Sequence, residues 1–97
     1  MAKYSITKEA REDLRSIWNY TLDNWSENQA VIYYNCLISE FEDIATSQDN
    51  FDKEYANIRE GLYCRRCRKH LIFYDKTNGK TIIIRVLHER MDIESKF

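Results

Sequence analysis

Four polar residues near the carboxyl end of the chain, His88, Glu89, Arg90 and Asp92, are of types that could carry out chemistry. An imidazole among carboxylates and guanidinium groups could take part in general acid–base catalysis. The same side chains could equally form ordinary salt bridges at the end of a strand. Arg85 interrupts an apolar run just before them, and an unpaired buried charge costs several kcal/mol. We therefore expect Arg85 to have a partner or to reach water, and we take Arg85 and His88 as candidates for catalysis.

Basic residues form a second group with chemical potential. Residues 59–69 hold five bases and one acid, whereas residues 40–54 hold six acids and one base. Clustered Arg and Lys side chains can bind phosphate groups or the acidic surface of another protein. Charges along a sheet edge can also serve only to prevent aggregation. The bases that we predict to form such a binding surface are Arg59, Arg65, Arg66, Arg68, Lys69, Arg85 and Arg90.

Two of the three cysteines, Cys64 and Cys67, form a CxxC pattern, which can indicate zinc or redox chemistry. On a strand, however, residues three apart point to opposite faces, so these two thiols should not converge. The third cysteine is Cys36, and His70 and His88 are the two histidines of the chain. We therefore expect no metal site and no cofactor, and we interpret the cysteines as small apolar residues. Their odd number is typical of a reducing cytosol.

The composition indicates one ordered domain over residues 1–97. Hydrophobic residues make up 43% of the chain and there are 2 glycines and no proline, so few loops are expected. No apolar run approaches the roughly 20 residues of a membrane span. The amino-terminal residues lack the hydrophobic core of a signal peptide, so we expect a cytoplasmic location. The net charge of −1 argues against a general attraction to nucleic acid.

We expect two helices to form one of the two layers that hold these candidate residues in place. Thr7 can cap a helix that runs to about Asn24. Ser26, with Gln29 three residues on, is typical of a capping box at the start of a second helix, which should end near Ser47. Because only a residue or two separate the helices, they should form an antiparallel hairpin. We interpret its packing seam as Trp18, Trp25, Tyr34 and Phe41.

Strand-like patterns supply the second layer, at residues 3–7, at 57–60 leading through Gly61 into 62–67, at 70–75 and at 81–87. A polar connection at residues 48–55 precedes the later strands. We expect a tight reversal near Arg68 and a β-hairpin at Asn78-Gly79. Because residues 81–87 are apolar apart from Arg85 and the leading threonine, we place that strand inside the sheet, beside the amino-terminal strand. The predicted class is α+β, in the order β-α-α-β-β-β: a strand, a two-helix hairpin and a three-stranded antiparallel meander.

Segments spread over nearly the whole chain resemble ParE-type toxins of the RelE/ParE superfamily. They are YSIT at 4–7, IWNYT at 17–21, IREGLY at 58–63, HLIFY at 70–74 and IRVLHERMD at 84–92, together with Ala10, Asp13, Leu14, Trp25, Gln29, Ala30 and Tyr33. The resemblance lies in their order and spacing. It implies the fold of that superfamily, a helix hairpin on a largely antiparallel sheet. It also implies the toxin half of a type II toxin–antitoxin pair.

For this family the resemblance further implies a target and a partner. ParE-type toxins poison DNA gyrase and thereby block replication. The expected antitoxin is ParD-like, with a DNA-binding ribbon-helix-helix part and a tail that wraps the toxin. Contact with nucleic acid would then be only indirect, through the antitoxin.

Two other functions remain open. One is a ribosome-dependent mRNA endonuclease of the RelE type. Such nucleases are usually strongly basic and commonly carry an acid–base Tyr or His close to the carboxyl terminus, whereas this chain has a net charge of −1 and ends in IESKF. The other is a non-toxic homologue that only binds an antitoxin and takes part in repression. We therefore predict an inhibitory binder of gyrase rather than an enzyme.

Overall fold

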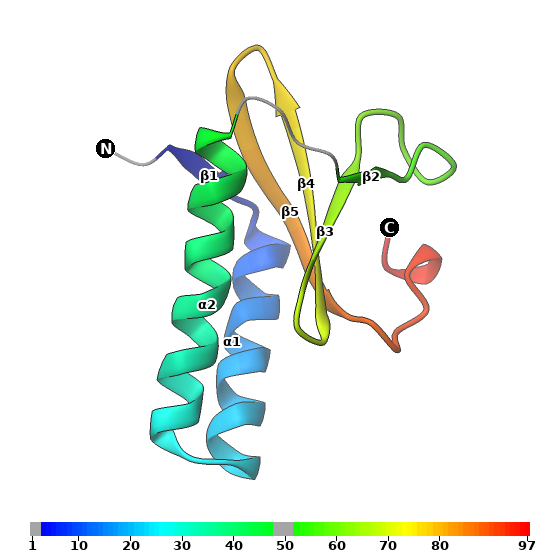
Figure 1. Ribbon diagram of the computed structural model, residues 1–97. Helices are drawn as coiled ribbons and strands as arrows, with labels where there is room; N and C mark the ends of the chain where they lie inside the picture. Colours follow the sequence, from blue (N-terminus) through cyan, green and yellow to red (C-terminus); the bar gives the residue numbers. More distant parts are fainter. Residues whose placement is uncertain (1–2, 48–51) are drawn as a thin grey trace.

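A helix hairpin packed on a twisted sheet makes up the computed structural model, which describes residues 3–47 and 52–97 (Figure 1). The helices are α1 (Lys8–Asn24) and α2 (Glu27–Thr46). The strands are β1 (Tyr4–Ile6), β2 (Lys53–Glu54), β3 (Tyr63–Cys67), β4 (His70–Thr77) and β5 (Lys80–His88), and a short 3₁₀ helix, η1 (Glu94–Lys96), follows. The α+β class and the helix hairpin are confirmed.

The sheet has the strand order β1-β5-β4-β3-β2. β1 runs parallel to β5, with Tyr4 opposite Thr81 and Ile6 opposite Ile83, and the other neighbours are antiparallel. The predicted interior place of the last strand, beside the amino-terminal strand, is confirmed. β1 is so short that it pairs with only the first part of β5. Beyond it, the Thr7 hydroxyl at the start of α1 donates to the Ile84 carbonyl at 2.7 Å.

Both helices begin where their capping residues predict. The Thr7 hydroxyl accepts a hydrogen bond from the Ala10 amide at 3.0 Å, and the Ser26 hydroxyl accepts one from the Gln29 amide at 3.1 Å. These bonds satisfy amide groups that have no partner inside a helix. The hairpin then packs one apolar stripe on the sheet. The core that results contains Ala10, Leu14, Leu37, Phe41, Ile44, Cys67, Ile72, Tyr74, Ile83 and Val86.

The predicted aromatic seam of the hairpin is correct at Phe41 and in the contact between Trp18 on α1 and Tyr34 on α2, and it is wrong at Trp25. Phe41 is fully buried, but Trp25 is 72% exposed. Trp18 and Tyr34 contact each other edge to face, with ring centroids 5.9 Å apart, and Tyr34 stays exposed. The reason is that the hairpin extends past the end of the sheet, so the residues near its tip have no second layer to pack against (Figure 1).

The predicted strand at residues 57–60 is also wrong. These residues form a turn in which the amides of Ile58 and Arg59 both donate to the Tyr55 carbonyl, at 3.0 and 3.1 Å. The pairing with β3 comes instead from Lys53–Glu54, within the predicted polar connection, of which residues 48–51 lie outside the described part of the chain. The apolar Ile58 packs on the sheet from its second face rather than extending it.

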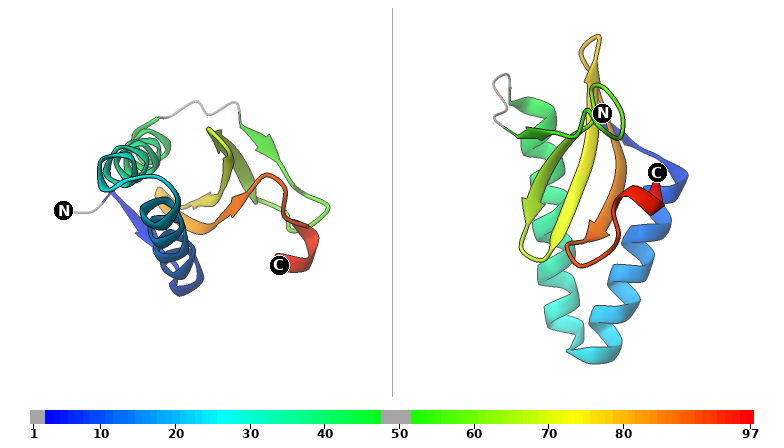
Figure 2. Two further views of the ribbon diagram at one scale, coloured as in Figure 1. Left: turned by 90° about the horizontal axis from the view of Figure 1, so that it is seen from below. Right: turned by 90° about the vertical axis from the view of Figure 1, so that its right-hand side faces the viewer.

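A smaller core lies on that second face, opposite the helices, and contains Leu62, Cys64, Phe73 and Leu87. Residues 55–62 and the carboxyl-terminal segment lie on this side of the sheet (Figure 2). Because β5 is covered from both sides, its sequence is almost continuously apolar. The predicted reversals are confirmed by positive φ angles at Arg68, at Asn78 and at Gly79.

Candidate functional site

Arg85 has the partner that its position in an apolar strand requires. Its Nε and Nη2 donate to the two oxygens of Asp13 on α1, at 2.7 and 2.8 Å. Asp13 also accepts from the Val86 amide at 3.0 Å, and Arg85 Nη1 donates to the Lys96 carbonyl at 3.0 Å. The hydrogen bond to Asp13 raises the pKa of the guanidinium against the opposing effect of burial. This two-pronged pair ties α1, β5 and the carboxyl-terminal segment together.

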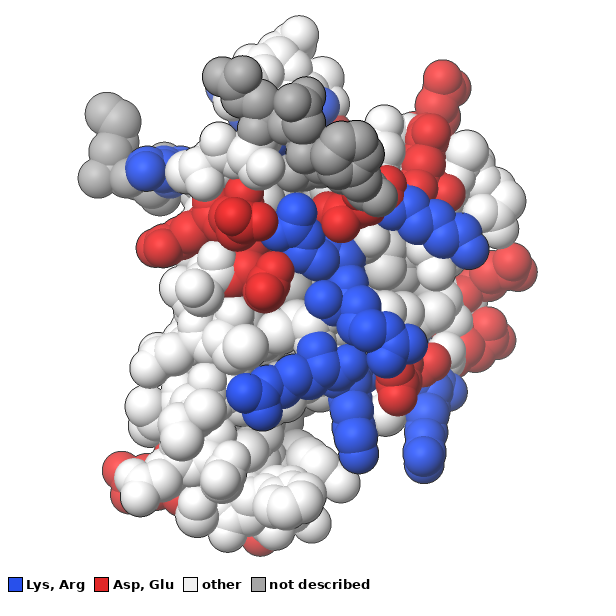
Figure 3. Space-filling view, viewed as in Figure 1, with Lys and Arg blue, Asp and Glu red and all other residues white. Residues whose placement is uncertain are grey.

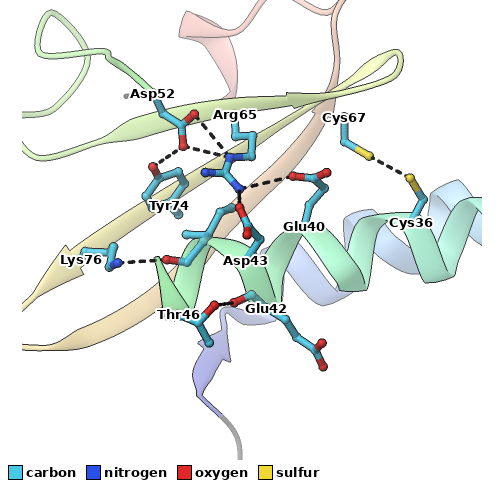
Figure 4. A network of polar contacts seen from close by, with 11 residues as sticks. Cys36, Glu40, Glu42, Asp43, Thr46, Asp52, Arg65, Cys67, Tyr74 and Lys76 are labelled. Carbon is cyan, nitrogen blue, oxygen red and sulfur yellow. Dashed lines mark hydrogen bonds and ion pairs between the residues drawn. The ribbon is translucent and has the colours of Figure 1, made fainter. Parts of the chain in front are cut away.

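Arg65 on β3 is the second arginine whose donors are used inside the molecule (Figure 4). Its Nη1 donates to Asp43 at 2.6 Å and to Glu40 at 3.3 Å, and its Nε donates to Asp52 at 3.0 Å. Burial alone would lower the pKa of the guanidinium, but these carboxylates raise it. Asp52 also accepts from the Tyr74 hydroxyl at 2.5 Å. Three acids of the acid-rich residues 40–54 therefore neutralise one arginine of the base-rich residues 59–69 within the same chain.

Four of the other predicted bases gather at one end of the sheet (Figure 3). The β3–β4 turn and the exit of β5 meet there, because the Glu89 amide donates to the Lys69 carbonyl at 2.9 Å. We call this group the basic corner, and it comprises Arg66, Arg68, Lys69 and Arg90. Arg66 pairs with Glu89, and the Arg68 guanidinium lies 5.7 Å from the centroid of the Tyr33 ring. Within the described residues, Arg68, Lys69 and Arg90 make no ion pair.

Arg59 lies apart from the basic corner, in the turn that covers the second face of the sheet. Its guanidinium meets Asp75 at 3.5 Å, and 51% of its side chain is exposed. An exposed pair at that distance contributes little to stability. Of the seven predicted contact residues, the structure therefore brings four together at the basic corner, leaves Arg59 elsewhere, and holds Arg65 and Arg85 in internal ion pairs.

A tyrosine and two histidines adjoin the basic corner. The Tyr33 hydroxyl on α2 lies 2.5 Å from His70 Nδ1, and the His70 and His88 rings meet edge to face with centroids 5.2 Å apart. His88 Nδ1 accepts a hydrogen bond from the Arg90 amide at 3.1 Å. Burial, reinforced by the neighbouring His88, lowers the pKa of His70 to about 4. His70 is therefore neutral at neutral pH, and its Nδ1 shares a hydrogen bond with the Tyr33 hydroxyl in which the tautomer of His70 decides which group donates.

Sequence reasoning found His88 but missed Tyr33 and His70. Counting back from the pair Thr77 and Lys80 at the tip of the hairpin would place His70 opposite Leu87. A bulge intervenes, because Phe73 lies opposite Arg85 while Tyr74 lies opposite Ile83. The extra residue moves His88 into the place across from His70. No pattern in the sequence indicates that bulge.

Next to the basic corner, the helix hairpin extends past the end of the sheet (Figure 2). This free half of the hairpin exposes apolar side chains. We call this half the overhang, and its exposed apolar residues are Tyr20, Leu22, Trp25, Val31, Ile32 and Tyr34. A shallow depression on it is lined by Trp18, Val31, Tyr34 and Asn35. Apolar residues gathered on a surface in this way mark sites of contact with other proteins.

The CxxC residues lie as predicted, on opposite faces of the sheet: Cys67 belongs to the core under the helices and Cys64 to the core on the second face. Over residues 3–47 and 52–97, no group of three or more His, Cys, Asp or Glu side chains is arranged to hold a metal ion. Neither helix in the same residues is long and apolar enough to cross a bilayer.

The same architecture occurs in a solved toxin–antitoxin structure. A chain of the chromosomal ParDE toxin–antitoxin system from P. aeruginosa superimposes with a TM-score of 0.74 over 89% of this chain and 96% of that chain. The two sequences are 12% identical, so this likeness concerns the fold alone.

Sequence comparison identifies the family. The family model described as "ParE toxin of type II toxin-antitoxin system, parDE" matches residues 4–93. Toxin ParE1 of Mycobacterium tuberculosis is 32% identical over 96% of this chain and 95% of its own length. Toxin ParE of Escherichia coli is 31% identical over 99% and 93%, and Toxin ParE1 of Caulobacter vibrioides 34% over 95% and 94%. The chain therefore belongs to the ParE toxin family of type II toxin–antitoxin systems, as the resemblance predicts.

Proposed function

We propose that this ParE-family chain acts in the cytoplasm by inhibiting DNA gyrase, and that it thereby blocks DNA replication. The observation that carries the proposal is the family match over residues 4–93, together with full-length similarity to toxins named ParE. In this proposal the chain is an inhibitory binder and not a catalyst. Its exposed apolar overhang is the kind of surface through which a protein binds another protein.

The second part of the proposal is the neutralising partner, a ParD-like antitoxin. We assign its docking site to the overhang and the basic corner, which adjoin each other. The overhang offers apolar side chains to the hydrophobic face of a helix, and the basic corner offers charge to acidic residues along its flank. The occupant is therefore an amphipathic, acidic segment of the antitoxin. Its charge would speed association and set its orientation.

The predicted basic residues have different roles in this proposal. Arg66, Arg68, Lys69 and Arg90 reach solvent at the basic corner and are available to acidic groups of the partner. Arg65 and Arg85 hold the sheet and the helices together through internal carboxylates, so we assign them a positioning role.

The test compares two activities of the purified protein. We expect it to inhibit supercoiling by gyrase, to leave translated mRNA intact on ribosomes, and to lose inhibition when a ParD-like antitoxin is added. Ribosome-dependent cleavage with unaffected supercoiling would reverse the assignment. Inactivity in both assays, with antitoxin binding intact, would instead support the non-toxic homologue.

One observation favours the endonuclease as a second candidate. Tyr33, His70 and His88 are joined beside the basic corner, and a neutral histidine hydrogen-bonded to a tyrosine is suited to moving a proton. Substitution His70→Gln separates the two candidates, because it should abolish mRNA cleavage but leave gyrase inhibition unchanged.

A further inference from the structure

Two cysteines that the proposed function does not use face each other across the two layers of the fold. The sulfur of Cys36 on α2 lies 3.7 Å from the sulfur of Cys67 at the end of β3 (Figure 4). Cys67 is 5% exposed, whereas Cys36 is only partly buried. A small oxidant can therefore reach the pair from the side of Cys36. Cys64 belongs to the core on the other face of the sheet and lies outside this pair.

We propose that Cys36 and Cys67 are an oxidation site, at which hydrogen peroxide converts the two thiols into a reversible intramolecular disulfide. The site is independent of the proposed gyrase inhibition. A disulfide holds its sulfur atoms about 2.05 Å apart, so the two sulfurs have to close a gap of roughly 1.7 Å. Because both side chains already point toward each other, no new contact between the two layers has to form first (Figure 4).

The reaction takes two steps, and the exposure of the thiols assigns their order. Cys36 attacks first, because it is the thiol that solvent reaches, whereas burial raises the pKa of the Cys67 thiol and keeps it protonated. The Cys36 sulfur bonds to one peroxide oxygen, the O–O bond breaks, and the departing hydroxide takes the thiol proton to become water. Cys36 is then a sulfenic acid.

In the second step the Cys67 sulfur attacks the Cys36 sulfur. The S–S bond forms as the S–OH bond breaks, and the hydroxide leaves as water with the Cys67 proton. In sum, two thiols and one hydrogen peroxide give one disulfide and two water molecules. The two sulfurs lose two electrons, which the peroxide gains.

The crosslink would fasten the basic corner to the helix hairpin. Cys67 directly precedes Arg68, and Arg68 lies over Tyr33, which is on the same helix as Cys36. The two cysteines are 31 residues apart, so the disulfide would also restrict the unfolded chain. A loop of that size predicts a rise in the midpoint of thermal unfolding on the order of 20 °C.

The test treats the reduced full-length protein with hydrogen peroxide, alkylates the remaining thiols, and measures the intact mass, the crosslinked peptides and the unfolding midpoint. The matched variants are Cys36→Ser, which removes the pair, and Cys64→Ser, which keeps it. We expect a Cys36–Cys67 crosslink and a raised midpoint in the wild type and in Cys64→Ser, both reversed by dithiothreitol. In Cys36→Ser we expect neither. A disulfide that includes Cys64, crosslinking only between molecules, or overoxidation of Cys36 without a crosslink would each overturn the assignment.

Discussion

Substitution Arg85→Ala is expected to destabilise the protein rather than to disable its binding surface. It removes both hydrogen bonds to Asp13 and leaves that carboxylate, whose side chain is 14% exposed, with the Val86 amide as its remaining hydrogen-bond donor among the described residues. Breaking a fully buried pair from one side costs about 3–5 kcal/mol. Because 19% of the Arg85 side chain still reaches water, we expect a smaller loss than for a fully buried pair, about 2–3 kcal/mol.

Urea unfolding of the variant measures this loss, and Arg90→Ala is the matched control because Arg90 is exposed and makes no ion pair with the described residues. In thermal unfolding, a loss of 2–3 kcal/mol corresponds to a fall in the melting temperature of roughly 10–20 °C for a chain of this size. The double variant Asp13→Ala/Arg85→Ala should lose less than the sum of the two single variants, because they share one interaction. An Arg85→Ala protein within about 0.5 kcal/mol of wild type, but with weakened antitoxin or target binding, would refute this reasoning and return Arg85 to the contact surface.

The remaining predictions concern the basic corner, the overhang and the histidine pair. Double charge reversal at Arg68 and Lys69 should weaken antitoxin binding by more than about 1 kcal/mol in titration calorimetry, whereas Arg59→Glu should change it little. Replacing the exposed Trp25 with serine should weaken the same binding with the unfolding free energy unchanged within about 0.5 kcal/mol, and equal affinity would exclude the overhang. Because the pKa of His70 falls from 6.5 to about 4 on folding, the unfolded state binds more protons between these values. Stability should therefore be complete above pH 6.5 and fall by about 1–2 kcal/mol as the pH drops toward 4, after allowance for the partial exposure of His70. His70→Gln should remove that part of the pH dependence, and an unchanged profile would contradict the assignment.

Much of the fold could be predicted from the sequence because the signals are local. Thr7 and Ser26 cap their helices through hydrogen bonds to backbone amides three residues further along the chain. Asn78 and Gly79 adopt the positive φ angles of a tight turn. The apolar run at residues 81–87 indicated an interior strand because burial on both faces leaves no place for alternating polar residues. Those elements depend on neighbours in the chain.

The errors fall where an apolar residue had more than one possible partner. Trp25 and Ile58 are both suited to a core, but the sequence does not say how far each layer extends. The sheet ends before the helix hairpin does, which leaves Trp25 in solvent, and the curved second face of the sheet receives Ile58 from a turn. Lengths of facing layers are properties of the assembled fold.

The family, the order of the helices and main strands, and the need of Arg85 for a partner follow from the amino-acid sequence alone. The carboxylate that pairs with Arg85 is set by the tertiary structure, since Asp13 is 72 residues away in the chain. The tertiary structure also pairs Arg65 with carboxylates of the same chain and places the Cys36 sulfur next to the Cys67 sulfur. One extra residue in β5 placed His88 across from His70. These pairings connect distant segments, and their geometry depends on strand register and on helix packing, which short-range patterns of residue type do not encode.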